Sequence, residues 1–201
     1  DDLYAGERLW DQVGGDQAQY RLAAAGYLLL PGTPFIYYGE EVGMSAGLGL
    51  SGDGKLRTPM SWSQDTRTAG FSTVTPFRAV SANVASQNVA SELNDPNSLL
   101  SFYKEMLRLR NTLPSIARGS YEASFTRGGV MGFQRAFGAE RTLVLINYAT
   151  SRAQVQVDAL AAAAKLTPAY PSGSSAVAAD AKGSVTLALP AQSVRVLVLG
   201  S

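Results

Sequence analysis

The sequence predicts an α/β segment followed by a small antiparallel β-sandwich. An apolar helical pattern at residues 17–30 is followed at once by a short aromatic run at residues 35–38, which makes half of an α/β repeat. Beyond Pro114, short β-rich runs alternate with turns, as in a sandwich. Because one strand cannot bury itself, we expect residues 1–115 to be the end of a larger barrel, with residues 116–201 as the sandwich.

The first helix is predicted from its ends and its apolar face. Asp16 can cap its first turn, and Pro31 with Gly32 ends it. We expect one helical face to be core; its apolar residues are Leu22, Ala25, Leu28 and Leu29. Residues 1–15 are polar and broken by glycines, so we expect a loop there.

The aromatic run at residues 35–38 is predicted to be a buried strand. It is too short for a helix and is bracketed by the turn residues Pro31–Gly32 and Gly39. Glu40 and Glu41 follow at its carboxyl end, where parallel barrels handle their ligands. Such a pair more often caps a helix or binds an arginine, so we expect a structural role for both.

The remaining segments divide into a long loop, a second helix and several strands. Residues 45–95 show no period, and so long a loop suggests a function. A second helix is predicted to open at Asp95–Pro96 and to end at Pro114. Its apolar stripe consists of Leu99, Leu100, Tyr103, Met106, Leu107 and Leu109. Strands are predicted at residues 130–137, 142–147, 153–157, 184–189 and 194–199.

Composition excludes several classes of function. The net charge is +1 with no block of Lys or Arg, so nucleic acids and anionic membranes are poor candidates as partners. The longest apolar run, residues 22–30, is far shorter than the ~20 residues that span a bilayer. No signal-like segment opens the chain, so any targeting segment is expected to have been removed or to lie outside it.

Histidine and cysteine are both absent. A Ser-His-Asp triad within this chain is therefore excluded, and the commonest transition-metal ligand is missing. Acid–base chemistry must rest on carboxylates, Lys or Tyr. The lack of cysteine fits either a cytoplasmic or an exported bacterial protein.

Four motifs carry a resemblance to a known family. Residues 2–12 are similar to a segment that begins at a conserved Asn-His-Asp, and residues 93–113 to a last barrel helix. Pro31-Gly-Thr-Pro-Phe-Ile-Tyr-Tyr-Gly-Glu-Glu-Val-Gly-Met44 resembles strand eight with its loop. Arg57-Thr-Pro-Met-Ser-Trp62 resembles the Arg-Thr-Pro-Met-Gln-Trp motif of oligosaccharide-acting members. Together they resemble the alpha-amylase superfamily, glycoside hydrolase family thirteen, from the end of barrel strand seven through the C-terminal β-sandwich.

The resemblance implies the terminal α/β units of a (β/α)8 barrel followed by the sandwich. It also implies a retaining glycoside hydrolase that cleaves α-glucosidic bonds in starch-derived glucans or oligosaccharides. Its partners would be that substrate and the remaining barrel segments of the same enzyme. The family's nucleophilic Asp and acid/base Glu belong to earlier strands, so this chain alone is expected to be inactive. Alternatives are a transglucosylase such as a trehalose synthase, or a non-catalytic carbohydrate-binding relative.

The resemblance implies a third carboxylate, which holds sugar hydroxyls and stabilises the transition state. Two alignments remain open. Either a conserved His precedes Asp1 and Asp1 has this role, or Asp2 has it by its spacing to Tyr4-Ala5-Gly6. A solvated acidic chain start is the structural alternative.

The irregular loop supplies further candidates. The resemblance implies substrate binding by Asp53 and Arg57, with a structural ion pair as the alternative. Tyr38 and Trp62 suit stacking on a sugar, although burial in the core is the stronger expectation.

No cofactor is expected, although some relatives carry a structural calcium. Calcium needs several convergent oxygens. Asp11, Asp16, Asp53 and Asp65 lack the spacing of a calcium loop, so no metal ligand is predicted.

Overall fold

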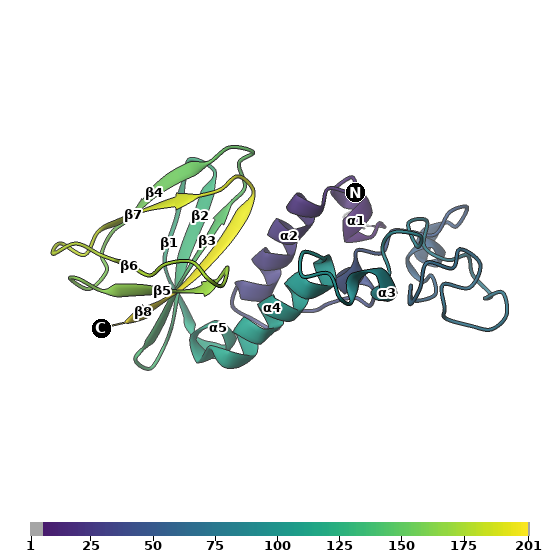
Figure 1. The fold of residues 1–201 in the computed structure, drawn as a ribbon, viewed down its shortest axis with the longest axis horizontal. Helices are drawn as coiled ribbons and strands as arrows, with labels where there is room; N and C mark the ends of the chain where they lie inside the picture. Colours follow the sequence, from purple (N-terminus) through teal and green to yellow (C-terminus); the bar gives the residue numbers. More distant parts are fainter. Residues whose placement is uncertain (1–5, 201) are drawn as a thin grey trace. The chain divides into compact units, whose positions relative to one another are not determined.

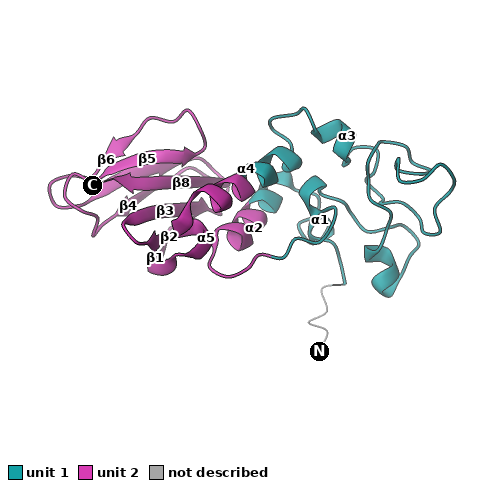
Figure 2. Cartoon of the chain, turned by 90° about the horizontal axis from the view of Figure 1, so that it is seen from below, with its two compact units in different colours: residues 1–21, 35–105 teal, residues 22–34, 106–201 magenta. Residues whose placement is uncertain are grey.

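The computed structural model describes residues 6–200 of the chain (Figure 1). Asp1 and Asp2 therefore lie outside the described residues. The chain forms two compact units, coloured separately in Figure 2. The first contains the residues up to 21 and residues 35–105; the second contains residues 22–34 and 106–201.

The first unit is built from short helices and long loops. Its helical segments are α1 (Leu9–Gln12), η1 (Glu40–Val42), η2 (Gly52–Leu56), α3 (Val89–Glu92) and the beginnings of α2 (Gln17–Leu29) and α4 (Leu99–Thr112). The Asp16 carboxylate accepts hydrogen bonds from the backbone N–H groups of Ala18 and Gln19, at 2.8 and 3.1 Å. The predicted cap is thereby confirmed, because this carboxylate satisfies N–H groups that have no partner within the helix.

The core of the first unit is aromatic and apolar. Tyr20, Val42, Met44, Leu99 and Tyr103 are all buried. The Tyr20 ring lies 6.3 Å from that of Tyr103, and the Tyr20 hydroxyl donates to the Glu40 carbonyl at 2.8 Å. One buried tyrosine of α2 thus contacts both α4 and η1.

The predicted buried strand at residues 35–38 is wrong. The segment has no strand partner among the described residues, and the Phe35 side chain is 88% exposed. A strand forms only when a neighbour supplies its ladder of hydrogen bonds, so an extended apolar segment without that neighbour stays a loop. The first fifteen residues also differ from the expected loop, because α1 lies within them.

The second unit is a helical segment followed by a β domain. After α5 (Pro114–Arg118) come β1 (Ser120–Arg127), β2 (Val130–Phe137), β3 (Glu140–Asn147), β4 (Ala153–Val157), β5 (Lys165–Tyr170), β6 (Val177–Ala178), β7 (Val185–Leu189) and β8 (Ser193–Gly200). One antiparallel sheet has the order β1-β2-β3-β8-β5-β6, and β4 pairs with β7 in a second sheet.

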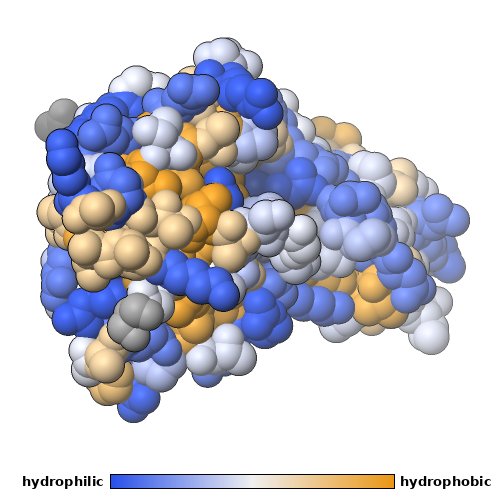
Figure 3. All heavy atoms as spheres, turned by 60° about the vertical axis from the view of Figure 1, so that its left-hand side comes forward, coloured by the Kyte–Doolittle hydropathy of each residue, from blue (hydrophilic) through white to orange (hydrophobic). Residues whose placement is uncertain are grey.

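Both sheets contribute to one apolar core, which explains the sandwich. The buried side chains include Leu143, Leu145 and Leu197 from the larger sheet and Val155 and Leu187 from the smaller one. Strand residues alternate between this core and the surface. The face drawn in Figure 3 carries both hydrophilic residues and a broad apolar area.

The five predicted strands are confirmed within two residues at each end, but β1, β5 and β6 were not predicted. β1 is an edge strand with a register shift between Glu122 and Phe125, and nearly all of it is exposed. β5 contains Pro168, which argues against a strand in a sequence reading. Pro114 begins α5 at its first turn, where proline is tolerated, as well as following α4.

Candidate functional site

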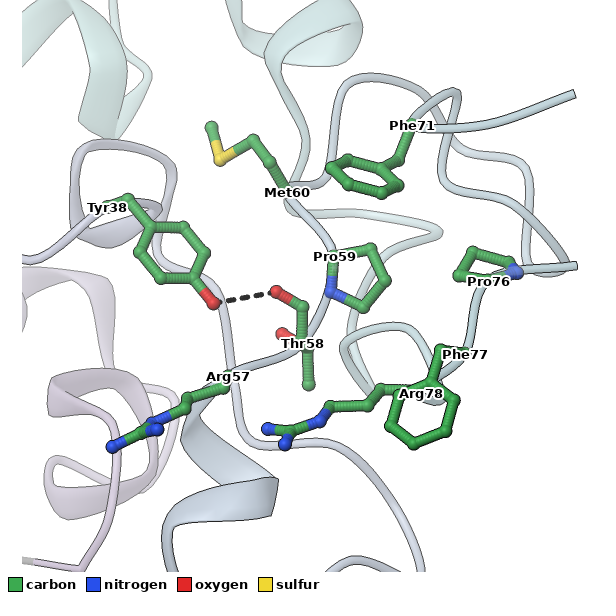
Figure 4. A pocket seen from close by; sticks show the side chains of 9 residues that line it. All are labelled: Tyr38, Arg57, Thr58, Pro59, Met60, Phe71, Pro76, Phe77 and Arg78. Atoms are coloured by element: carbon green, nitrogen blue, oxygen red, sulfur yellow. Dashed lines mark hydrogen bonds between the residues drawn. The ribbon is translucent and has the colours of Figure 1, made fainter.

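The long loop of the first unit forms a pocket of about 370 Å³ (Figure 4). Its walls come from two of the motifs identified in the sequence and from the loop that follows them. The lining residues are Tyr38, Arg57, Thr58, Pro59, Met60, Phe71, Pro76, Phe77 and Arg78. All of these residues except Tyr38 belong to the irregular loop at residues 45–95.

Tyr38 fixes one wall of the pocket. Its hydroxyl donates a hydrogen bond to the Thr58 carbonyl at 2.8 Å, drawn as the dashed line in Figure 4. Desolvation raises the pKa of the Tyr38 phenol above its usual value, and the nearby Arg8 guanidinium opposes this shift. The phenol therefore stays protonated at neutral pH and serves as a donor rather than a base.

Arg57 lines the pocket and is paired with Asp53. The Arg57 Nη2 and Asp53 Oδ2 atoms are 2.6 Å apart, but both side chains are more than half exposed. An exposed pair four residues apart contributes little to stability, so the guanidinium can exchange this partner for a ligand at low cost. Asp53 itself is absent from the pocket lining.

The remaining walls are aromatic and cationic. Phe77 is 98% exposed and Phe71 is 55% exposed, and Arg78 lines the same pocket. Ring faces can stack on the C–H faces of a sugar, and guanidinium groups can donate several hydrogen bonds to its hydroxyls. No carboxylate is among the lining residues, so this pocket is suited to binding and cannot cleave a glycosidic bond unaided.

A buried arginine that the sequence analysis did not single out lies against the pocket. Arg8 is 3% exposed, and its Nη1 and Nη2 atoms donate to the carbonyls of Tyr38 and Leu56, at 2.5 and 2.6 Å. Nothing in its local pattern marks it, because an arginine in a polar loop is usually solvated. Its role depends on chain segments that are 30 and 48 residues away.

Other predicted residues take different places. Tyr38 and Trp62 are 39% and 51% exposed, so the expected burial of these rings in a core is wrong. Of the two, only Tyr38 lines the pocket. Glu40 and Glu41 lie in η1, where a Glu40 carboxylate oxygen accepts from the Tyr37 N–H at 3.3 Å.

The described residues hold no group of three His, Cys, Asp or Glu side chains that could bind a metal ion. Likewise, none of the helices in the described part is long and apolar enough to cross a membrane.

The described residues share their fold with part of larger solved structures, each of which the chain covers to less than half. Isomaltulose synthase from Klebsiella sp. LX3 superimposes with a TM-score of 0.77 over 96% of this chain and 41% of its own, at 23% sequence identity. Trehalulose synthase from Pseudomonas mesoacidophila MX-45 gives a TM-score of 0.73 over 97% of this chain and 42% of its own, also at 23% identity. At this level of identity the likeness concerns the fold alone.

A family model described as the alpha-amylase catalytic domain matches residues 6–119. The chain therefore belongs to the alpha-amylase family. The match includes α1 to α4 and every residue that lines the pocket.

Curated relatives are similar over about two thirds of the chain. A trehalose synthase from Thermus thermophilus is 38% identical over 150 residues, which are 70% of this chain and 15% of that protein. An oligo-1,6-glucosidase from Parageobacillus thermoglucosidasius is 28% identical over 174 residues, 67% of this chain and 31% of that protein. A probable alpha-glucosidase from Rhizobium meliloti is 33% identical over 153 residues, 68% of this chain and 28% of that protein. The chain thus spans less than a third of the length of these relatives.

Proposed function

We propose that the whole protein is a retaining glycoside hydrolase that cleaves α-glucosidic bonds in starch-derived glucans or oligosaccharides. The observation that carries this proposal is the pocket formed by Tyr38, Arg57 and Phe77. Tyr38 belongs to the segment that resembles strand eight of the superfamily, and Arg57 opens the motif that resembles one of oligosaccharide-acting members. The names of the relatives, which include an oligo-1,6-glucosidase and a probable alpha-glucosidase, support the same substrate class.

We also propose where this chain belongs in that enzyme. Residues 1–115 are the C-terminal part of a (β/α)8 barrel, and residues 116–201 are the C-terminal β-sandwich domain. The order of the motifs supports this placement, as does the sequence of helices and loops before residue 119 and strands after it. The partner of the first unit is then the remainder of the barrel.

Retaining hydrolysis requires a nucleophilic carboxylate and an acid/base carboxylate about 5–5.5 Å apart. We assign both to barrel segments outside this chain. The described residues of the chain contribute binding: guanidinium donors and aromatic faces orient the sugar. Orientation of this kind accelerates the reaction because the reacting atoms are held in place before the bond breaks.

Within the chain, one of Asp1 and Asp2 is proposed to stabilise the transition state. A carboxylate that grips the distorted sugar acts mostly in the transition state, so its loss lowers kcat far more than it raises KM. Arg57 and Asp53 are also proposed to bind substrate: Arg57 donates directly to sugar hydroxyls, and Asp53 acts through its hydrogen bond with Arg57.

The activity itself is tested in the full-length protein. We expect it to hydrolyse maltooligosaccharides or isomaltooligosaccharides, with NMR showing the α-anomer as the first product. A folded full-length protein that turns over no α-glucoside would overturn the proposal. A first product in the β-configuration would overturn the retaining mechanism alone.

The carboxylate is tested by Asp1→Asn and Asp2→Asn, made separately in that enzyme. We expect one variant to lose roughly 100- to 1000-fold in kcat, the usual cost of one strong electrostatic contact in a closed site. The other variant is the matched control and should keep near-normal kcat. If both keep it, neither Asp has the role.

A transglucosylase is the second candidate, favoured by the 38% identity to a trehalose synthase. The same pocket would then hold the acceptor sugar instead of the leaving part of a glucan. Incubation with maltose separates the two: glucose alone indicates hydrolysis, whereas trehalose as the main product indicates transfer.

A further inference from the structure

We propose that Arg8 is the positioning residue of the pocket. It holds the segment that contains Tyr38 and the segment that contains Arg57 at a fixed position relative to each other, and this position sets the affinity for the sugar. This inference rests on the proposed function, because it assigns Arg8 to the sugar pocket. Arg8 is absent from the residues that line the pocket, so it acts through others.

The first observation is the pair of hydrogen bonds made by one buried guanidinium. One nitrogen donates to the Tyr38 carbonyl at 2.5 Å and the other to the Leu56 carbonyl at 2.6 Å. These carbonyls belong to the two loops that form the pocket. A planar guanidinium presents its donors in a fixed fork, so the two loops are held at a defined separation.

The second observation is that the Arg8 guanidinium lies over two aromatic rings. The Arg8 Cζ atom lies 4.8 Å from the Tyr37 ring centroid and 4.7 Å from that of Tyr38. The two rings are themselves 4.7 Å apart, at an interplanar angle of 51°. Attraction between the cation and both ring faces fixes the guanidinium laterally, while the hydrogen bonds fix it along the loops.

The third observation is that these contacts close a ring of interactions. Tyr38 donates from its hydroxyl to the Thr58 carbonyl at 2.8 Å, while Arg8 binds the backbone of Tyr38 and of Leu56. Arg57 lies between Leu56 and Thr58 in the sequence, so hydrogen bonds to the carbonyls on both sides of it fix the position of its backbone. An ion pair of 3.7 Å between Lys55 and Glu7 supports the same junction.

Lysine cannot replace this residue without loss. Its ammonium group is a point charge without a planar fork, and it stacks less well on aromatic rings. It can keep one of the carbonyl contacts, but the geometry of the second is lost. The Arg8→Lys substitution therefore preserves the charge and removes the positioning.

The experiment uses Arg8→Lys in the full-length protein, with Arg135→Lys as the matched control. Arg135 is also buried and also donates to backbone carbonyls, but it does not line the pocket or contact its loops. We expect Arg8→Lys to lower kcat/KM for an oligosaccharide roughly 10- to 100-fold, mainly through a higher KM. Arg135→Lys should lower the melting temperature and leave both kinetic constants within about twofold.

Hydrogen–deuterium exchange gives a readout that does not depend on activity. In Arg8→Lys, and not in the control, we expect faster exchange in the peptides that contain residues 37–40 and 56–60. Unchanged exchange in these peptides would overturn the proposal, as would kinetic constants equal to those of the control. If the wild type turns over no α-glucoside, the proposed function fails, and the exchange data still decide whether Arg8 braces the pocket.

A milder variant covers the case in which Arg8→Lys does not fold. Tyr37→Leu removes one ring from beside the guanidinium and leaves the hydrogen bonds in place; Tyr37 is 43% exposed and does not line the pocket. We expect KM to rise about 2- to 5-fold, the equivalent of one partly exposed cation–π contact. An unchanged KM in a folded Tyr37→Leu protein would count against the proposed positioning role of Arg8.

Discussion

At the scale of single residues, the least expected feature is a buried glutamate. Glu92 is 6% exposed, and one of its carboxylate oxygens accepts a hydrogen bond from the Leu100 N–H at 2.9 Å. The other oxygen is buried without a hydrogen-bond partner. Burial raises the pKa of Glu92 from 4.5 to about 7, against the Leu100 hydrogen bond and the distant charge of Arg21. Repulsion by Asp95 and Glu41 adds to the rise.

This carboxyl group makes stability depend on pH. Between pH 4.5 and about 7, the folded state holds a proton at Glu92 that the unfolded state has lost, so the free energy of unfolding falls as the pH rises. Glu92→Gln mimics the protonated form and keeps an oxygen for Leu100. We expect it to raise the melting temperature by a few degrees at pH 8 and to change it little at pH 5.

The measurement is thermal unfolding of the full-length protein at the two pH values. Glu122→Gln, at an exposed position on β1, is the control and should leave the pH dependence as in the wild type. An equal shift at both pH values would mean that Glu92 is charged in the folded protein, contrary to this account.

At the scale of elements, the carboxyl end of α2 is held by two arginines. Arg110 donates to the carbonyls of Leu28, at 2.8 Å, Leu30, at 3.2 Å, and Gly32. Arg135 donates to the Leu29 carbonyl at 2.9 Å. Cations are favoured at this end of a helix, because its last carbonyls have no partner within the helix. Desolvation lowers the pKa of both guanidinium groups, yet they remain charged at any physiological pH.

The two arginines should differ in their contribution to stability. Arg135 is 1% exposed and also donates to the carbonyls of Gly119 and Ser120, at 2.7 and 3.0 Å, whereas Arg110 is partly exposed. Arg135→Met leaves buried carbonyls without donors, and we expect a loss of about 2–4 kcal/mol. In Arg110→Met, water can reach some of the carbonyls, so about 1 kcal/mol is expected.

Denaturant unfolding of the two variants measures this order. The substitutions are matched in chemistry and act on the same helix end, which makes each the control of the other. Equal losses, or a larger loss for Arg110→Met, would show that burial of the carbonyls does not govern the cost.

At the scale of the whole molecule, the first unit exposes much apolar surface. Phe35, Leu48, Val74 and Phe77 are between 66% and 98% exposed. Soluble monomers rarely leave many large apolar side chains of one region uncovered. The proposed remainder of the barrel would cover part of this surface and supply the missing strand partners of residues 35–38.

The 201-residue chain alone should therefore differ from the full-length protein in two ways. We expect it to bind a hydrophobic dye strongly, because the apolar side chains of the first unit are uncovered. We also expect no hydrolysis of maltooligosaccharides, because no candidate nucleophile or acid/base residue has been assigned in it. Fluorescence titration and a reducing-sugar assay measure the two properties, with the full-length protein as the reference. Turnover by the pure chain, or weak dye binding by a folded monomer, would contradict the proposed placement.

Local pattern was enough for much of the architecture. The caps and apolar spacing of α2, the stripe of α4 and the alternating runs of β2, β3, β4, β7 and β8 all express their own periodicity, which neighbouring residues along the chain determine. The motif at residues 57–62 was also recognised from the sequence alone, and four of its residues line the pocket.

Only the folded structure could decide features that depend on distant partners. The run at residues 35–38 has the composition of a strand, but a strand needs a neighbour, and none is present in the described part of the chain. The role of Arg8 could not be predicted for the same reason. Its guanidinium contacts an aromatic ring and carbonyl groups, and the two carbonyls lie 30 and 48 residues away in the sequence. The periodicity of a sequence indicates which face of a helix or strand is buried. Two separate loops that meet around one guanidinium group form tertiary contacts, and such contacts leave no periodic pattern in the sequence.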